Sequence, residues 1–180
     1  MLTYMSIRDE IRLRVAEGKL RYLPHTLPSV QRMRTLFVSE EVSRVVLPPW
    51  DASPEGLRFS QLRAQLDTFS AGGLISMAQD PFTKPQATYM ARIDPPADEV
   101  WDIRSIDPRP AIRVLGCFAE TDLFIALTWD YRKNLGGPIS KEWRDFRERC
   151  KAIWRSLFHS YQPFRGTAIS EYISENVHAV

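Results

Sequence analysis

Glycine, histidine and cysteine are scarce in this sequence, and their scarcity excludes several kinds of active site. The eight glycines form neither a Gly-rich phosphate loop nor a Gly-x-Ser-x-Gly nucleophile elbow. The histidines form no His-Glu-x-x-His zinc motif, and none has a carboxylate or cysteine partner in the sequence pattern; they are His25, His159 and His178. A histidine-based catalytic triad is therefore not expected.

The two cysteines are Cys117, in an expected strand, and Cys150, in an expected helix. They form neither a Cys-x-x-Cys pair nor a zinc-ligand spacing. Free cysteine is among the most buried residue types, so we expect two reduced core residues. The sequence predicts no metal site and no cofactor.

Long apolar runs are also missing. No segment approaches the roughly 20 apolar residues of a membrane-spanning helix, and no signal-peptide pattern opens the chain. We therefore expect a cytoplasmic protein without a membrane partner. The 24 basic and 22 acidic side chains nearly balance, with a formal net charge of +2. Strong non-specific nucleic-acid binders usually carry a basic domain or stripe, and the overall charge gives no such signal.

Proline, in contrast, is abundant. The 13 prolines among 180 residues exceed the roughly 5% average and cut the chain into short elements, which disfavours a long helical bundle. The length suits one sizeable hydrophobic core. We expect a single domain over residues 33–160, preceded by a helical arm and linker (1–32) and followed by a C-terminal tail (161–180). Translation starts at Met1 or at Met33, and the arm is either packed on the core or appended to it.

Two amphipathic helices are expected. Ser53, Pro54 and Glu55 form a typical helix start, and apolar residues then recur at three- and four-residue spacing, at Phe59, Leu62, Leu66 and Phe69. A closing helix begins after Ser140 and carries an apolar stripe of Trp143, Phe146, Cys150, Ile153 and Leu157. Shorter helices are expected at residues 6–17, 74–78 and 169–177.

From residue 86 the apolar period becomes strand-like. Four strands are expected at 87–93, 99–104, 111–118 and 123–129, joined by short polar turns suited to hairpins, and a first strand at 34–39. The last two strands are apolar on both faces, so they should be central and covered on both sides. The predicted fold is α+β: an antiparallel β-meander of four to five strands, with an N-terminal helical segment and a closing amphipathic helix.

Cations mark the ends of these strands. Arg104 ends one strand, Arg113 opens the next, and Arg132 and Lys133 follow the last, beside Tyr131. Neighbouring antiparallel strands bring such positions within about 5–8 Å of one another. Guanidinium groups bind phosphate through paired donors, so a cluster of these cations could form a phosphate site. The alternative is that these cations form ordinary ion pairs, with Asp102, Asp107, Asp130 or Glu120.

Three segments of this meander carry a resemblance to a known family. They are VWDIR at 100–104, IRVLGCF at 112–118, and LFIAL at 123–127 leading to YRK at 131–133. Together with the order strand, helical segment, meander and final helix, they resemble the RelE/ParE toxin superfamily, and most closely its HigB-like, phage-derived branch. In that family a strand ending in Glu-Leu-Arg, a strand beginning Arg-Val and a hydrophobic strand ending in a basic pair follow in this order. The resemblance covers about residues 57–160.

The resemblance implies a metal-independent endoribonuclease that cuts messenger RNA at the ribosome and is silenced by an antitoxin. By position, the catalytic residues would be Arg104, Arg113, Tyr131 and Lys133. Arg104 and Arg113 would stabilise the phosphate during attack by the ribose 2′-hydroxyl, Lys133 or Arg132 would neutralise charge, and Tyr131 would orient or share a proton. Contacts to RNA would fall to Arg132 and Arg109. Tyr and Lys ordinarily titrate near 10, at about 10 and 10.4, so either would need strong tuning to act as a base.

A second function class stays open. The same scaffold could serve as a non-catalytic protein-interaction module. A contiguous positive concave face would favour the ribonuclease, whereas an exposed apolar patch would favour the interaction module.

Overall fold

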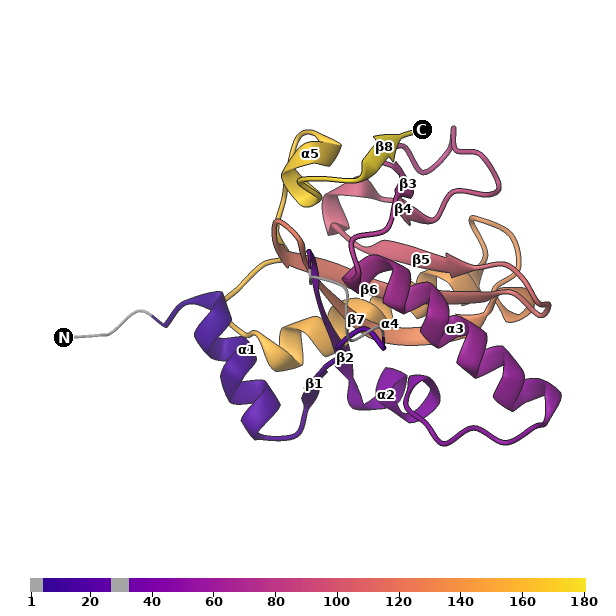
Figure 1. Ribbon diagram of the computed structural model, residues 1–180. Helices are drawn as coiled ribbons and strands as arrows, with labels where there is room; N and C mark the ends of the chain where they lie inside the picture. The colour runs from indigo at the N-terminus through magenta and orange to yellow at the C-terminus, as the bar shows by residue number, and fades with distance from the viewer. Residues whose placement is uncertain (1–4, 27–32) are drawn as a thin grey trace.

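A single eight-stranded sheet runs through the computed structural model, which describes residues 5–26 and 33–180 (Figure 1). The strand order is β1-β2-β7-β6-β5-β4-β3-β8. In chain order the strands are β1 (Leu20–Tyr22), β2 (Thr35–Ser39), β3 (Ile75–Ala78), β4 (Met90–Arg92), β5 (Trp101–Ser105), β6 (Ile112–Glu120), β7 (Leu123–Tyr131) and β8 (Val177–Ala179).

The sheet is mixed. Strands β4, β5, β6 and β7 form an antiparallel meander, and β1 is antiparallel to β2. Strand β2 pairs parallel with β7, and β3 pairs parallel with both β4 and β8. Because parallel neighbours need a long crossover connection, the chain leaves the sheet after β2 and returns through two helices before the meander is built.

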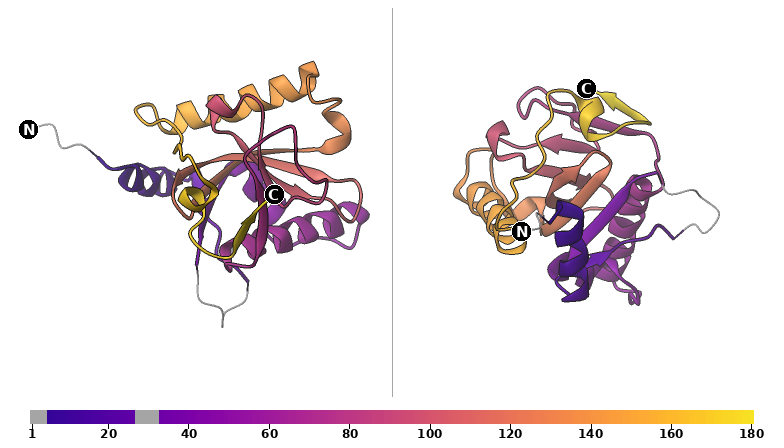
Figure 2. Two further views of the ribbon diagram at one scale, coloured as in Figure 1. Left: turned by 90° about the horizontal axis from the view of Figure 1, so that it is seen from above. Right: turned by 90° about the vertical axis from the view of Figure 1, so that its left-hand side faces the viewer.

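Helices cover both faces of the sheet, which gives three layers (Figure 2). On one face lie α2 (Glu40–Val46) and α3 (Pro54–Ser70), and on the other lies α4 (Lys141–Leu157). Helix α1 (Ile7–Ala16) packs at the β1 end on the side of α4, and α5 (Ile169–Tyr172) lies near β8 (Figure 1). A short 3₁₀ turn, η1 (Pro96–Asp98), connects β4 to β5, and a second, η2 (Arg132–Asn134), follows β7. Within the described residues, none of the helices has the length and apolar character to cross a membrane.

Each face has its own hydrophobic core. On the α3 face, Leu62, Leu66 and Phe69 pack against strand residues that include Trp101 and Phe118. On the α4 face, the buried helix residues are Phe146, Cys150, Trp154 and Leu157. Both cysteines are free and buried in the second core, as expected from the sequence. Strands β6 and β7 lie between the two cores, which confirms that they are central and covered on both sides.

The predicted fold class was wrong in its sheet. The sequence predicted an antiparallel meander of four to five strands, whereas the structure has one mixed eight-stranded sheet and five α-helices in the described residues. The additional strands β1, β3 and β8 have three or four residues each, too few to show a period of two. The segment 74–78, expected to be a short helix, contains β3, and the helix expected at 169–177 ends at Tyr172 before β8 begins.

The two end segments of the chain take part in the sheet. In the N-terminal segment, Ile11 and Leu20 are buried in the α4-side core and β1 extends the sheet beside β2. In the C-terminal segment, Tyr172 and Ile173 are fully buried on the α3 side and β8 pairs with β3. The described parts of the arm and of the tail therefore pack on the same sheet as residues 33–160.

We expect Phe146→Ala to lower the free energy of unfolding by about 3–5 kcal/mol, the usual cost of truncating a large buried aromatic side chain. Phe146 is 4% exposed in the α4-side core. Trp143, in the predicted stripe, is only half-buried, so Trp143→Ala should cost less than Phe146→Ala. Chemical denaturation of both variants, with the exposed Arg155→Ala as a control, measures this order. Equal losses for the two aromatic variants would contradict the packing.

Candidate functional site

The strongest candidate site is a pocket of about 600 Å³ on the α4 side of the sheet, called the cation pocket below. Three parts of the chain meet around it: the loop between β3 and β4, the ends of β5 and β6 that face one another, and the segment that leads into α4. Its charged lining residues are Lys84, Asp94, Asp102, Arg104, Arg113, Arg132, Arg144 and Arg147. Cations thus outnumber carboxylates in the lining.

At the base of the pocket, one carboxylate lies between two arginines. Arg104 on β5 is directly opposite Arg113 on β6, and side chains opposite one another share a face of the sheet. Asp102 lies two residues before Arg104, so it projects to the same face. The Nε of Arg104 lies 3.1 Å from each carboxylate oxygen of Asp102, and the Nε of Arg113 lies 3.3 Å from Oδ2.

This ion cluster is withdrawn from water. The side chains of Asp102, Arg104 and Arg113 are 1%, 8% and 12% exposed. Burial lowers the pKa of Arg113 to about 10; Asp102 opposes the shift, while Arg104 and Arg132 add to it. Because this value is still well above neutral pH, Arg113 stays charged, and the base of the pocket holds more positive than negative charge at low dielectric.

Two further cations reach the cluster from outside the two strands. Lys84, in the loop between β3 and β4, has its pKa lowered by burial and then by the nearby charge of Arg104. Arg132, in η2, donates a hydrogen bond of 2.7 Å to the carbonyl of Gly136 and lies over the ring of Trp143, 5.8 Å from its centroid. Lys84 therefore joins Arg104 and Arg113 near the carboxylate of Asp102, and Arg132 lies close enough to Arg113 to help lower its pKa.

The rim of the pocket is apolar and partly aromatic. Phe82 is 70% exposed and Ile139 is 95% exposed, and the half-buried Trp143 lines the pocket at the start of α4. Ser140 caps α4 and accepts a hydrogen bond from the backbone N–H of Trp143, which fixes the first turn of the helix at this wall. A ligand in the pocket would meet charge at the base and ring faces at the mouth.

The structure brings together three of the residues singled out from the sequence. Arg104, Arg113 and Arg132 all line the cation pocket, so the expectation that neighbouring strands bring the strand-end cations together is confirmed for these three and not for Lys133. The alternative, ordinary pairing with Asp102, holds at the same time. It does not neutralise the cluster, because one carboxylate serves two guanidinium groups.

Tyr131 and Lys133 are not part of this cluster. Tyr131 pairs with Ile112 across β6 and β7, and its side chain lies on the α3 face. Its hydroxyl donates a hydrogen bond of 3.1 Å to Glu55. Burial and this hydrogen bond raise the pKa of Tyr131, which makes a general-base role harder. Lys133 lies 5.6 Å from the centroid of the Tyr131 ring.

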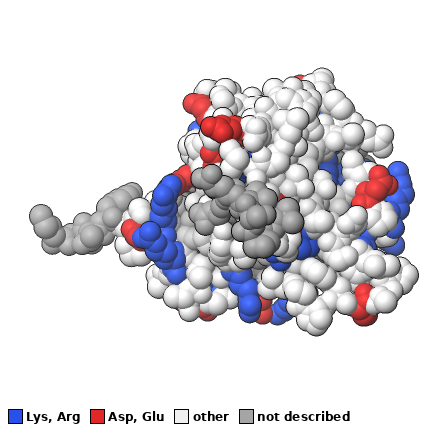
Figure 3. Space-filling model, in the orientation of Figure 1, with Lys and Arg blue, Asp and Glu red and all other residues white. Residues whose placement is uncertain are grey.

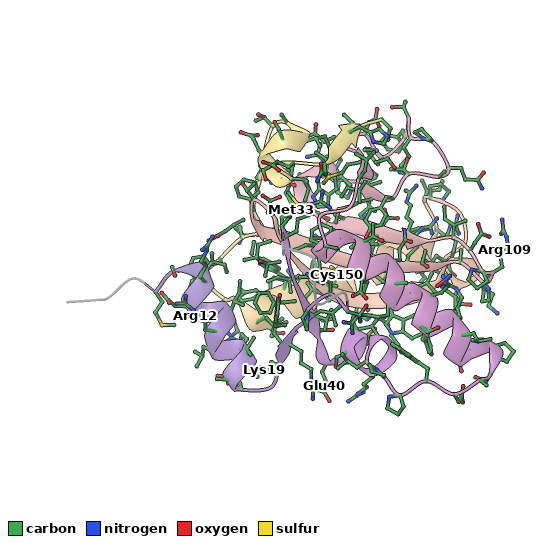
Figure 4. The ribbon with its side chains drawn as sticks, viewed as in Figure 1. Arg12, Lys19, Met33, Glu40, Arg109 and Cys150 are labelled. Carbon is green, nitrogen blue, oxygen red and sulfur yellow. The ribbon has the colours of Figure 1, made fainter. Side chains whose placement is uncertain are left out.

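Arg109 is also separate from the pocket. It lies in the turn between β5 and β6 and projects from the end of that hairpin (Figure 4). On the face that carries α3, Lys and Arg side chains form separate groups, with acidic side chains beside them (Figure 3). The described part of that face therefore presents no continuous basic band.

Sequence reasoning missed Lys84, Phe82 and the entire loop between β3 and β4. This loop joins two strands of four and three residues, and it reaches the pocket only because β4 pairs with β5. No motif in the sequence marks that pairing. Asp102 was considered as an ion-pair partner, but not as the centre of the cluster.

Comparisons with known proteins give no relative: no family model, no curated protein and no solved structure matches this chain. In the described residues, no group of three or more His, Cys, Asp or Glu side chains is placed to hold a metal ion. The inference of function therefore depends on the cation pocket itself.

We expect inorganic phosphate and sulfate to stabilise the folded protein through this pocket. A ligand that binds only the folded state raises its stability, and 1 kcal/mol raises the melting temperature of a chain of this size by about 2–4 °C. Thermal melts in phosphate and in chloride at equal ionic strength measure the effect. The increase should disappear in Arg113→Met and persist in Lys133→Met. An identical increase in both variants would place the anion elsewhere.

Proposed function

We propose that the cation pocket binds a phosphodiester of RNA and that the protein is an endoribonuclease of messenger RNA. One observation carries the proposal: Arg104, Arg113, Arg132 and Lys84 line the pocket together, and the two buried arginines Arg104 and Arg113 share the one carboxylate of Asp102. Desolvated cations in excess of their counterions are costly unless an anion joins them. Phosphate, which accepts paired hydrogen bonds from guanidinium groups, is the anion that suits arginines best.

The order of the strands and helices along the chain supports the same function. Strand β2, helices α2 and α3, the meander β5-β6-β7 and the closing helix α4 follow one another in the order on which the resemblance to RelE/ParE toxins rests. In the structure these elements are part of a wider sheet, to which β1, β3, β4 and β8 add. Arg104, Arg113 and Arg132 lie in the segments that carry the resemblance.

The proposed reaction is an internal transfer at phosphorus. The ribose 2′-oxygen attacks the adjacent phosphorus, the bond from phosphorus to the 5′-oxygen breaks, and the products are a 2′,3′-cyclic phosphate and a 5′-hydroxyl. Arg104 and Arg113 stabilise the charge that develops on the non-bridging oxygens, where a single pre-placed donor is commonly worth about 2.7–4 kcal/mol. No water is consumed, so the pocket needs only to hold the phosphate and move one proton.

We assign the transfer of that proton to the side chain of Lys84. The arginine side chain does not give up its proton in proteins, so it cannot serve as the base, and Tyr131 and Lys133 lie outside the pocket. Burial and the neighbouring cation Arg104 lower the pKa of Lys84, which increases its neutral fraction. Neutral Lys84 accepts the 2′-hydroxyl proton as the new bond to phosphorus forms, and its ammonium returns a proton to the departing 5′-oxygen.

The apolar rim suits a single-stranded substrate. Phe82 and Trp143 present aromatic rings in the same pocket as the phosphate-binding arginines. Unpaired nucleobases stack on such rings with little dependence on sequence. A double helix would keep its bases away from the rim. We therefore assign the substrate as single-stranded RNA.

We expect purified protein to cleave a short single-stranded RNA to products ending in a 2′,3′-cyclic phosphate, and to bind the matching 2′-deoxy strand without cutting it. Arg104→Met and Arg113→Met should each lower the cleavage rate by about 10²–10³-fold, because each removes a donor to the charged transition state. End-labelled substrates resolved on denaturing gels give the rates and the product ends.

Two variants outside the pocket serve as matched controls. Tyr131→Phe and Lys133→Met alter residues from the same strand end without touching the pocket, so both variants should cleave at the wild-type rate. A loss in these two variants equal to that of Arg113→Met would contradict the assignment of the site. A folded wild type that neither binds the deoxy strand nor cuts RNA would contradict the proposed function.

Lys84→Arg tests the proton-transfer role alone. Arginine keeps the positive charge but does not become neutral at ordinary pH, so we expect binding of the deoxy strand to persist while the cleavage rate falls by about 10²–10⁴-fold, the usual contribution of acid–base catalysis. For the wild type, the rate should rise with pH until the lysine is neutral. Retained cleavage by Lys84→Arg would exclude Lys84 as the base.

A protein partner is the second candidate function. Phe82 and Ile139 are large apolar side chains exposed at the pocket mouth, which favours a protein such as an antitoxin that covers the opening. Acidic groups on that protein would pair with the cations that RNA would otherwise meet. Binding without cleavage in the assay above, together with tight binding of an acidic peptide, would favour a non-catalytic interaction module on this scaffold.

A further inference from the structure

Asp102 is an unexpected residue in a pocket that is proposed to bind an anion. A carboxylate near a phosphate repels it, so its presence has to be explained by what it does to the cations. It is 1% exposed, and both of its oxygens are occupied: Oδ1 accepts from the Nε of Arg104 at 3.1 Å and from the backbone N–H of Ala91 at 3.2 Å. Oδ2 accepts from the Nε of Arg104 at 3.1 Å and lies 3.3 Å from the Nε of Arg113 in an ion pair.

The contact atoms are informative. A guanidinium group has one donor on Nε and four on its two Nη atoms. In both arginines, Nε is the guanidinium atom that lies against the Asp102 carboxylate. In residues 5–26 and 33–180, the Nη atoms of Arg104 have no hydrogen-bond partner, and those of Arg113 have one bond of 3.3 Å, from Nη1 to the carbonyl of Ile112. The Nη atoms that lack a partner, both of Arg104 and Nη2 of Arg113, are not among the buried unpaired atoms, so they keep accessible surface for a ligand in the pocket.

We infer that Asp102 is a positioning residue, which holds Arg104 and Arg113 by their Nε atoms so that their Nη groups jointly bind one tetrahedral oxyanion, the phosphate of the ligand. The inference rests on the phosphate-binding part of the proposed function and not on cleavage. Arg104 and Arg113 are direct cross-strand neighbours, so their guanidinium groups lie side by side and can each take a different oxygen of one phosphate. A planar carboxylate ligand has only two oxygens, so it can form paired hydrogen bonds with only one of the two guanidinium groups.

The backbone supports this arrangement. Ala91 is paired with Asp102 across β4 and β5, and its N–H bonds the Asp102 carboxylate directly. The position of the Asp102 carboxylate is therefore fixed by a backbone hydrogen bond within the sheet as well as by the two arginines. Side chains that fix ligand-binding groups in this way commonly change affinity by about 10–100-fold when they are altered, as measured at metal sites.

Asp102→Asn separates positioning from simple charge neutralisation, because the two predict opposite signs. The substitution adds one positive charge to the pocket. If Asp102 only neutralised charge, the variant would bind an anionic strand more tightly. If Asp102 positions the arginines, we expect affinity for an uncleavable 2′-deoxy strand to fall by about 10–100-fold, measured by fluorescence anisotropy. Asp107→Asn is the matched control, because Asp107 is an exposed acid in the β5–β6 turn; its affinity should be unchanged or slightly higher.

A spectroscopic measurement reports on the arrangement itself. In the wild type, nitrogen–proton NMR spectra should show the Nε–H signal of Arg104 protected from exchange, and addition of inorganic phosphate should change the Nη signals of Arg104 and Arg113 while the Nε protection remains. Asp102→Asn should lose the Nε protection, and Asp102→Glu should restore part of it. Tighter strand binding by Asp102→Asn, with Nε protection intact, would overturn the inference.

Arg104→Lys decides the case if Asp102→Asn does not fold in a thermal melt. Lysine keeps the positive charge, but its ammonium group has no Nε to contact Asp102 and no paired Nη donors to bind phosphate. The affinity for the deoxy strand should therefore fall as in Asp102→Asn. Wild-type affinity in Arg104→Lys would overturn the inference. The inference and the proposed function fail separately. A wild type that binds phosphate through the Nη atoms but leaves RNA intact contradicts the ribonuclease and leaves the role of Asp102 standing.

Discussion

The alternation of side chains along β5, β6 and β7 is the constraint on which the rest of the structure depends. Each strand is covered on both faces, so successive residues enter different cores: Val114 packs beneath α3, whereas Leu115 packs beneath α4. The same alternation continues to the strand ends, where the cores give way to charged residues. It sends Arg113 to the α4 side and Tyr131 to the α3 side, although the two residues belong to neighbouring strand ends. A set of residues close in sequence pattern is therefore divided between two surfaces.

At the end of the α4 face, the loss of apolar contacts is compensated by ionic ones. Asp102 continues the inward row of β5 and would be a costly buried charge if it were alone. It is stabilised by two guanidinium groups and one backbone N–H. The pocket forms because three further elements meet above this cluster without filling it: the loop with Lys84, η2 with Arg132, and the first turn of α4 with Trp143. The loop with Lys84 is far in the sequence from η2 and α4, and it is brought to them by the pairing of β4 with β5 and by the packing of α4.

The sequence predicted the parts of this structure that have long periodic patterns. The stripe of α4, the stripe of α3 and the central strands were recognisable because each repeats its period several times. Predicting the convergence of Arg104 and Arg113 required only a hairpin between 105 and 110 and the antiparallel register. The full sheet could not be predicted, because β1, β3 and β8 have three or four residues each and join it through tertiary pairing. The roles of Tyr131 and Lys133 came from the resemblance by position along the chain, which does not say to which face of β7 a residue points. Lys84 had no signal, because a single lysine in a proline-rich loop looks like any solvated loop residue.

The charge arrangement of the pocket distinguishes a binding site from a stabilising one. If the cluster served only the fold, one arginine for the one aspartate would satisfy the buried charges, and apolar residues of similar volume would often stabilise it more. The chain instead places a second arginine opposite the first, at a cross-strand distance where like charges repel, and adds Arg132 and Lys84 above them. Burial lowers the pKa of Arg113 and of Lys84, so the folded state bears a cost for keeping these cations together without an anion. Local arrangements that oppose stability are concentrated at functional sites, where a ligand relieves the cost. A phosphate in the pocket would supply the missing negative charge and would bind most strongly where the fold is least satisfied by itself.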